Sequence, residues 1–110
     1  MIEQVFKLSQ TKEKTVDKVI QDENIDYIHM RFNKDEGLPL HSSNSNVYMT
    51  ILQGQVSIGL DDQAVKAYPK GTLLKIPYKT KMNVQNKHDE MLELLVIKAP
   101  SPRTFMNKSG

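Results

Sequence analysis

The residues of this chain that could do chemistry fall into two short runs. They are Gly37, His41, Ser43, Val47 and Gly54, followed by Gly71, Pro77, Lys79, Met82 and Asn86. The imidazole of His41 could bind a metal ion or move a proton, whereas the thioether of Met82 is a soft ligand that suits copper(I). Ser43 is a poor ligand unless it is deprotonated, and Val47 has no donor atom. Because an iron, manganese or zinc centre needs about three good protein ligands, the two runs predict neither a metal site nor a cofactor.

His41 is the one candidate in these runs for general acid–base catalysis. If it is buried among apolar side chains, desolvation should keep the imidazole neutral, with one donor and one acceptor nitrogen. Such catalysis usually pairs the histidine with an acidic or tyrosine side chain, yet Tyr48 is expected to point outward and Glu90 to lie in a turn. The other two histidines, His29 and His88, are expected to be solvated surface residues.

Short strands must position these residues, because apolar and β-branched residues alternate with polar ones along most of the chain. In residues 26–32 the alternation places Ile28 and Met30 on one face and His29 on the other. The remaining predicted strands are 47–52, 55–60, 63–68, 72–76, 81–84 and 90–98. Periodicity alone leaves the last segment open between a buried helix and a buried strand, and the regular spacing of the strands before it favours a strand. An all-β domain is therefore expected.

Turns and chain ends complete this organisation. Asp61 and Asp62 predict a two-residue hairpin, because both tolerate a positive φ. Residues 1–18 are expected to form an N-terminal segment, and residues 101–110 a polar C-terminal tail without a regular ladder. The apolar pair in that tail, Phe105 and Met106, is expected to make an incidental packing contact, with a strap across a dimer as the alternative.

Composition excludes several classes of function. The net charge of +2 comes from 15 Lys and Arg against 13 Asp and Glu, with the lysines scattered among acidic residues. Because Arg31 and Arg103 are the only arginines and aromatic residues make up 6% of the chain, a nucleic-acid partner is not expected. The absence of cysteine rules out disulfides, thiolate zinc sites and cysteine nucleophiles. No run approaches the ~20 apolar residues of a membrane span and no secretory leader is recognisable, so a cytoplasmic protein without a membrane partner is expected.

The two runs resemble the two sequence motifs of the cupins. The first cupin motif has a glycine, two histidines separated by one residue, a glutamate and a closing glycine; the corresponding residues here are Gly37, His41, Ser43, Val47 and Gly54. The second has a glycine, a proline, a glycine, a histidine and an asparagine; the corresponding residues are Gly71, Pro77, Lys79, Met82 and Asn86. Most turn and strand-end residues are kept, whereas His41 alone survives of the four metal ligands.

This resemblance implies a cupin-type double-stranded β-helix, or jelly-roll barrel, as a single domain over residues 19–100. The cup of such a barrel would be apolar and methionine-lined here, with a few polar groups, which is the usual form of a small-molecule site. The residues expected to bind a ligand in it are His41, Ser43, Val47, Met49 and Met82. A small barrel can also fill its interior with side chains, and core packing is the more ordinary role of the two methionines.

Two functions from different classes remain open. The favoured one is a metal-free cupin that binds an unidentified small molecule as a sensor, carrier or accessory protein. The alternative is a small cupin enzyme, either an isomerase or epimerase or a metal-dependent enzyme, that uses His41; an enzyme is the less expected of the two. A barrel that acts through a protein interface is a third possibility. Cupins commonly form homodimers, and apolar outer positions such as Tyr48 and Tyr68 favour a homodimer here.

Overall fold

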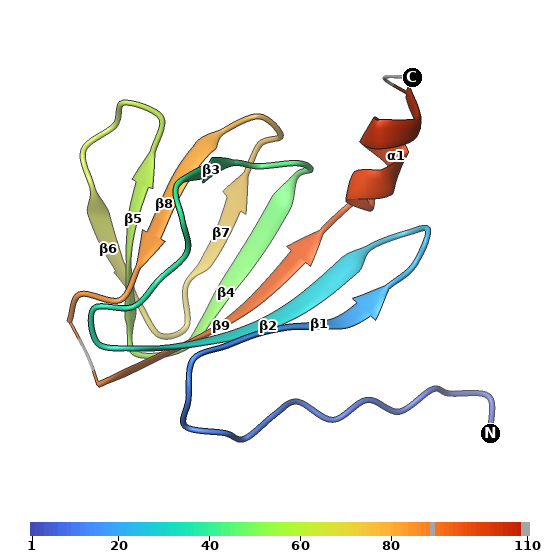
Figure 1. Ribbon diagram of the computed structural model, residues 1–110, viewed down its shortest axis with the longest axis horizontal. Helices are drawn as coiled ribbons and strands as arrows, with labels where there is room; N and C mark the ends of the chain where they lie inside the picture. The colour runs from blue at the N-terminus through green and yellow to red at the C-terminus, as the bar shows by residue number, and fades with distance from the viewer. Residues whose placement is uncertain (89, 109–110) are drawn as a thin grey trace.

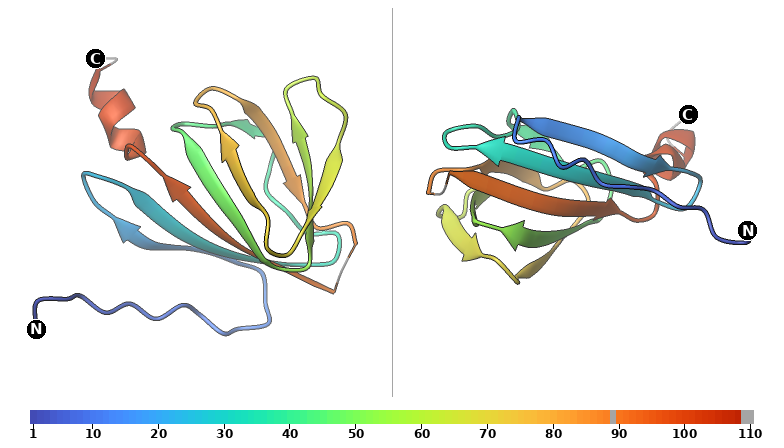
Figure 2. Two further views of the ribbon diagram at one scale, coloured as in Figure 1. Left: turned by 180° about the vertical axis from the view of Figure 1, so that it is seen from behind. Right: turned by 90° about the horizontal axis from the view of Figure 1, so that it is seen from below.

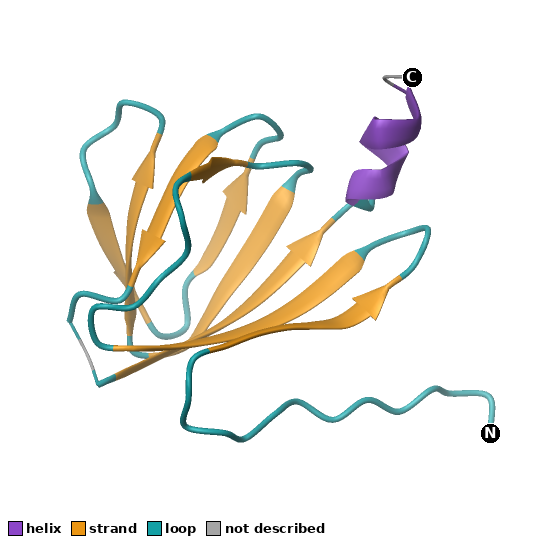
Figure 3. Ribbon diagram, viewed as in Figure 1, coloured by secondary structure: helices purple, strands orange, loops and turns teal. Residues whose placement is uncertain are grey.

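The chain folds into two antiparallel β-sheets, as the computed structural model describes for residues 1–88 and 90–108 (Figure 1). One sheet has five strands in the order β1-β2-β9-β4-β7, and the other has four in the order β3-β8-β5-β6. A short helix, α1, follows the last strand, and the N-terminal segment projects past the edge of the five-stranded sheet (Figures 2 and 3). In chain order the elements are β1 (Thr15–Gln21), β2 (Asp26–Asn33), β3 (His41–Ser42), β4 (Val47–Gln53), β5 (Gln55–Leu60), β6 (Lys66–Pro69), β7 (Leu73–Ile76), β8 (Lys81–Gln85), β9 (Met91–Lys98) and α1 (Pro102–Lys108).

The predicted all-β class is confirmed. Strand β5 has the predicted bounds, and the segment that could have been a helix is β9. β9 lies between β2 and β4 and pairs with both, and its residues alternate between buried and half-buried positions as the period of a strand requires. The turn after β5 is longer than the predicted two-residue hairpin, because β6 begins only at Lys66; Asp61 in this turn has the expected positive φ of 50°.

Strand β1 was not predicted. It pairs with β2 from Thr15↔Arg31 to Gln21↔Asp26, so the predicted boundary at residue 18 falls inside a strand. β1 is an edge strand with one neighbour, and its sequence, TVDKVIQ, mixes charged and apolar residues because one edge of it faces water. The alternation of apolar and polar residues that is typical of a strand is therefore not recognisable in this segment.

The C-terminal tail contains a helix where irregular structure was expected. Pro102 occupies the first position of α1, where its fixed φ suits a helix, and the carbonyl of Ser101 accepts a hydrogen bond from the Thr104 amide at 2.9 Å. The ring of Phe105 stacks on Tyr78 with centroids 4.0 Å apart, which makes Phe105 the predicted packing contact. Nowhere in the described ranges does a helix have the length and apolarity needed to cross a membrane.

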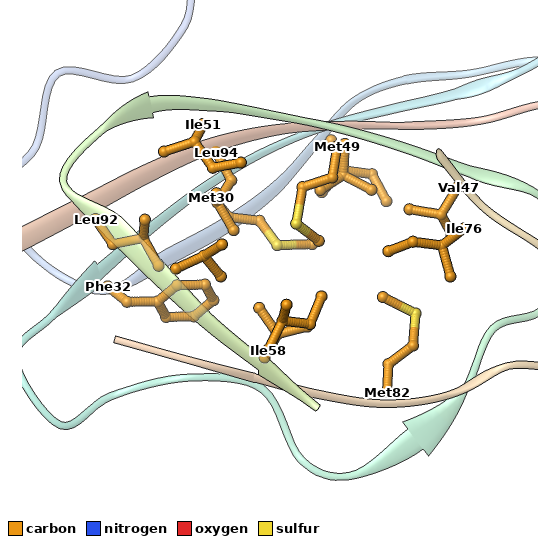
Figure 4. Packing of buried hydrophobic residues seen from close by; sticks show 14 residues of the cluster. Met30, Phe32, Val47, Met49, Ile51, Ile58, Ile76, Met82, Leu92 and Leu94 are labelled. Atoms are coloured by element: carbon orange, nitrogen blue, oxygen red, sulfur yellow. The ribbon is translucent and has the colours of Figure 1, made fainter. Parts of the chain in front are cut away.

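The core consists of inward-pointing apolar side chains from both sheets (Figure 4). Alternate residues of β2, β4 and β9 are buried, as the period of a strand requires. The cluster contains Ile28, Met30, Phe32, Val47, Met49, Ile51, Val56, Ile58, Ile76, Met82, Val84, Leu92, Leu94 and Val96. These side chains lie between the sheets and are at most 5% exposed, and Tyr68, expected at an outer position, packs against them.

The outer face of the five-stranded sheet carries a buried ionic cluster. His29, expected on the surface, is 0% exposed there, because it lies between Asp17 of the unpredicted β1 and Leu95 of β9. Its Nε2 lies 2.7 Å from Glu93 Oε2, to which Arg31 Nε also donates at 3.1 Å. Burial raises the pKa of the Glu93 carboxyl, but hydrogen bonds from His29 and Arg31 outweigh burial and hold that pKa below its ordinary value. His88 is exposed, as expected.

Replacing this carboxylate should make stability less dependent on pH. A group whose pKa is lowered by folding stabilises the native state above its unfolded pKa, and this contribution is lost as the pH falls through the lowered value. Glu93→Gln should therefore cost about 1–2 kcal/mol at neutral pH, and the difference from the wild type should shrink below about pH 4. Urea unfolding at pH 7 and pH 3 measures it; an equal cost at both values would contradict the ionic role of Glu93.

The two motif glycines Gly54 and Gly71 allow a matched comparison. Both have a positive φ, of 79° and 89°, but an added Cβ would lie 2.3 Å from the Met91 carbonyl oxygen at Gly54 and would meet nothing within 4 Å at Gly71. Gly71→Ala should therefore cost about 1 kcal/mol for its backbone conformation alone, and Gly54→Ala about 3 kcal/mol or more. Thermal and urea unfolding measure both values. Equal losses would show that the close approach at Gly54 is unimportant.

Candidate functional site

A pocket of about 260 Å³ opens at the edge of the barrel where β1 and β2 meet the connection to β3. We call it the mouth pocket; it is lined by Val16, Lys18, Ile28, Met30, Leu38, Pro39, His41 and Lys98. Register explains why the strand residues share one face: Val16 pairs with Met30, and Lys18 pairs with Ile28. Lys98 lies two residues after the inward-facing Val96, so it is on the same face of β9. Leu38, Pro39 and His41 complete the pocket from the other side.

The mouth pocket has an apolar floor and a basic rim. Ile28 and Met30 are buried at its floor, while Lys18 and His41 are exposed at its edge. Lys98 is half-buried, and its ammonium donates to the Asn44 side chain at 2.9 Å. Burial lowers the pKa of Lys98; the Asp26 carboxylate opposes this effect, and the Lys18 cation adds to it. The residues that line this pocket in the described structure include no acidic side chain.

His41 is exposed at the pocket edge. The burial among apolar side chains that was considered for it from the sequence is therefore not found. Its Nδ1 lies 2.8 Å from the Pro39 carbonyl oxygen. A carbonyl only accepts hydrogen bonds, so Nδ1 carries the hydrogen and Nε2 of the neutral ring keeps its lone pair. The imidazole could therefore accept a proton or a hydrogen bond at Nε2, but its pocket neighbours are basic and apolar rather than acidic.

Ser43 has a structural role in the turn before β8. Its hydroxyl donates to the Pro77 carbonyl at 2.8 Å and accepts from the Thr80 amide at 2.9 Å, and its side chain is 3% exposed. Its backbone carbonyl also accepts from the Lys79 amide at 3.0 Å. Lys79 has a φ of 69°, in the region that glycine prefers and that the cupin motif fills with glycine. The hydroxyl of Ser43 thus helps to fix this turn.

Val47, Met49 and Met82 lie in the core rather than along the mouth pocket. Their exposed fractions are between 1% and 3%, and Figure 4 shows Met82 pointing from β8 toward Val47 and Ile76. The ordinary reading of the two methionines as core residues is therefore confirmed. His41 pairs with Met82 in the β3–β8 register, so the motif positions are neighbours, but only His41 reaches the pocket. Direct ligand contact by the other four predicted residues stays a prediction.

Asn86 explains why the end of the second motif is kept. It is fully buried, and its side-chain amide donates to the Phe32 carbonyl at 3.0 Å. Its backbone amide donates to the Glu36 carbonyl at 2.8 Å, and its carbonyl accepts from the Asp35 amide at 2.7 Å. Asn86 thereby holds the turn after β2 against the end of β8.

The residues that the structure describes provide no set of metal ligands. No group of three or more His, Asp or Glu side chains among them is placed to hold a metal ion. A single imidazole with two lysine side chains nearby is a poor match for a divalent cation. The arrangement can instead enclose an apolar group on Ile28 and Met30 and direct N–H donors at a polar one.

Sequence reasoning missed most of the mouth pocket. Val16 and Lys18 belong to the unpredicted β1, and Leu38 lies in a connection that no strand pattern covers. Lys98 alone carried a usable signal, because it continues the inward positions of β9 after Val96. Of the five predicted ligand-binding residues, the structure places His41 at this pocket.

Comparisons with known proteins agree with this fold. No family model matches the chain. An uncharacterized protein of Methanocaldococcus jannaschii is 35% identical over 104 residues, which are 94% of this chain and 90% of that protein. The crystal structure of the same archaeal protein, described as an RmlC-like cupin family protein with a double-stranded β-helix fold, superposes with a TM-score of 0.93 at 34% identity and covers 96% of this chain and 98% of that chain.

More distant structures show the same architecture. An RmlC-like cupin protein from Desulfovibrio desulfuricans has a TM-score of 0.70 at 26% identity and covers 92% of this chain and 93% of that chain. A cupin superfamily protein from Desulfitobacterium hafniense has a TM-score of 0.71 at 17% identity over 84% of this chain and 82% of that chain, a likeness of fold alone. With two sheets in jelly-roll order and a full-length relative above 30% identity, the chain belongs to the cupin family.

Proposed function

We propose that this cupin is a non-catalytic module that binds a small, partly apolar molecule in the mouth pocket, as a sensor, carrier or accessory protein. The observation that carries the proposal is the composition of that pocket: an apolar floor of Ile28 and Met30 together with the polar side chains of Lys98 and His41. Concave sites with few polar groups on an apolar lining are typical of ligand binding. A volume of about 260 Å³ lies just below the usual range for drug-sized ligands, so the pocket suits a smaller molecule.

Two features favour binding over catalysis. His41 has no acidic or tyrosine side chain among the residues that line the pocket with it, and general acid–base catalysis usually relies on such a second group. Four of the five predicted ligand-binding residues, Ser43 included, have structural contacts in the core or its turns. An enzyme that uses His41 is therefore the alternative, and the experiment below distinguishes it from a binding module.

The assignment to a compartment rests on the sequence. A cytoplasmic location, without nucleic-acid or membrane partners, remains our prediction from composition and charge.

Filling the mouth pocket should abolish small-molecule binding without unfolding the protein. Val16 is 44% exposed at the pocket wall, so Val16→Trp can place an indole over the opening without entering the core. A fragment library screened by ligand-observed NMR should give hits that shift the amide signals of Leu38 and His41 in the wild type. Val16→Trp should weaken these hits at least about tenfold, since bulk at the opening removes their contact area.

Val65→Trp is the matched control, because Val65 is 66% exposed in the turn between β5 and β6 and lines no part of this pocket. It should leave the hits unchanged. Hits that ignore Val16→Trp would contradict the assignment of the pocket. Turnover of any hit that His41→Ala abolishes would favour the enzyme, and stoichiometric iron, manganese, zinc or nickel in untagged protein would overturn the metal-free form of the proposal.

A further inference from the structure

We infer that the ligand of the mouth pocket is a small carboxylate with an apolar body; this inference rests on the proposed function. Lys18 and Lys98 both line the pocket, and no acidic side chain lines it with them in the described structure. The chain as a whole is nearly neutral, with a net charge of +2. Two lysines without a lining acid are therefore a local excess of positive charge rather than a reflection of a basic protein.

Lys98 is the central donor of this site. Its ammonium is half-buried, which costs solvation, and it has the Lys18 cation nearby. The carboxylate of Asp26 stabilises the Lys98 cation. Asp26 also forms an ion pair with Arg103, whose guanidinium lies 2.6 Å from Asp26 Oδ1. An anion in the pocket would offset the repulsion between the two lysines and replace part of the lost hydration of Lys98.

Lys98 and His41 have N–H groups that could donate hydrogen bonds to such an anion. The Asn44 side chain takes one N–H of Lys98 at 2.9 Å, and an ammonium group has three. His41 donates to the Pro39 carbonyl through Nδ1, so the protonated imidazole could donate to an anion through its Nε2 hydrogen. The floor of Ile28 and Met30 can take only an apolar group. A carboxylate joined to a short apolar body matches both halves of the pocket.

Benzoate and its neutral isostere benzamide test this inference. In ¹H–¹⁵N NMR titrations, benzoate should shift the amide signals of Leu38, His41 and Lys98, and it should bind at least about tenfold more tightly than benzamide because it adds a charge-assisted hydrogen bond. Lys98→Met should remove this preference by weakening benzoate while leaving benzamide unchanged. Lys75→Met is the matched control: Lys75 is exposed beside the Tyr48 ring, outside the mouth pocket.

The outcomes separate the inference from the function on which it rests. Equal affinities for the two probes at this pocket would overturn the carboxylate inference and leave the binding function standing. A preference for benzoate that survives Lys98→Met, or that Lys75→Met also removes, would likewise overturn it. Failure of both probes and of the fragment library to perturb the pocket would overturn the proposed function itself.

Discussion

The strict alternation of side chains along antiparallel strands is the constraint on which the rest of this structure depends. The inward positions of β2, β4 and β9 face those of the other sheet, and apolar side chains occupy them except at one end, where Asp26 pairs with Lys98. Val47 and Met82 therefore act as core residues at positions where other cupins place metal ligands. Packing of the interior leaves the edge of the barrel, beside β1, as the place where a small molecule can be enclosed.

The fold could be predicted because its signals are local and repeated. Turn and strand-end residues of the two motifs are explained by backbone geometry: Gly54 has a φ of 79° and no room for a Cβ, and Asn86 holds two turns together by hydrogen bonds. The elements that escaped prediction are those at the margins. β1 and β3 are edge strands with one neighbour each, and α1 has seven residues and packs through the contact of Phe105 with Tyr78.

Of the five predicted ligand-binding residues, only His41 lines the candidate site, and the reason is physical. The mouth pocket is assembled from an edge strand, a connection and the last residue of β9, which are far apart in sequence. Period-2 alternation tells which face a residue shares, but it does not tell where one sheet extends beyond the other. The same limit explains the error for His29: without β1, the outer side of β2 looks like solvent rather than the location of a buried cluster with Glu93 and Arg31.

The two faces of the five-stranded sheet then have separate roles that do not compete. Its inner face supplies the floor of the mouth pocket through Ile28 and Met30, and its outer face carries the ionic cluster around Glu93. Because successive residues of β2 point to opposite faces, Met30 and Arg31 belong to different sites although they are adjacent in sequence.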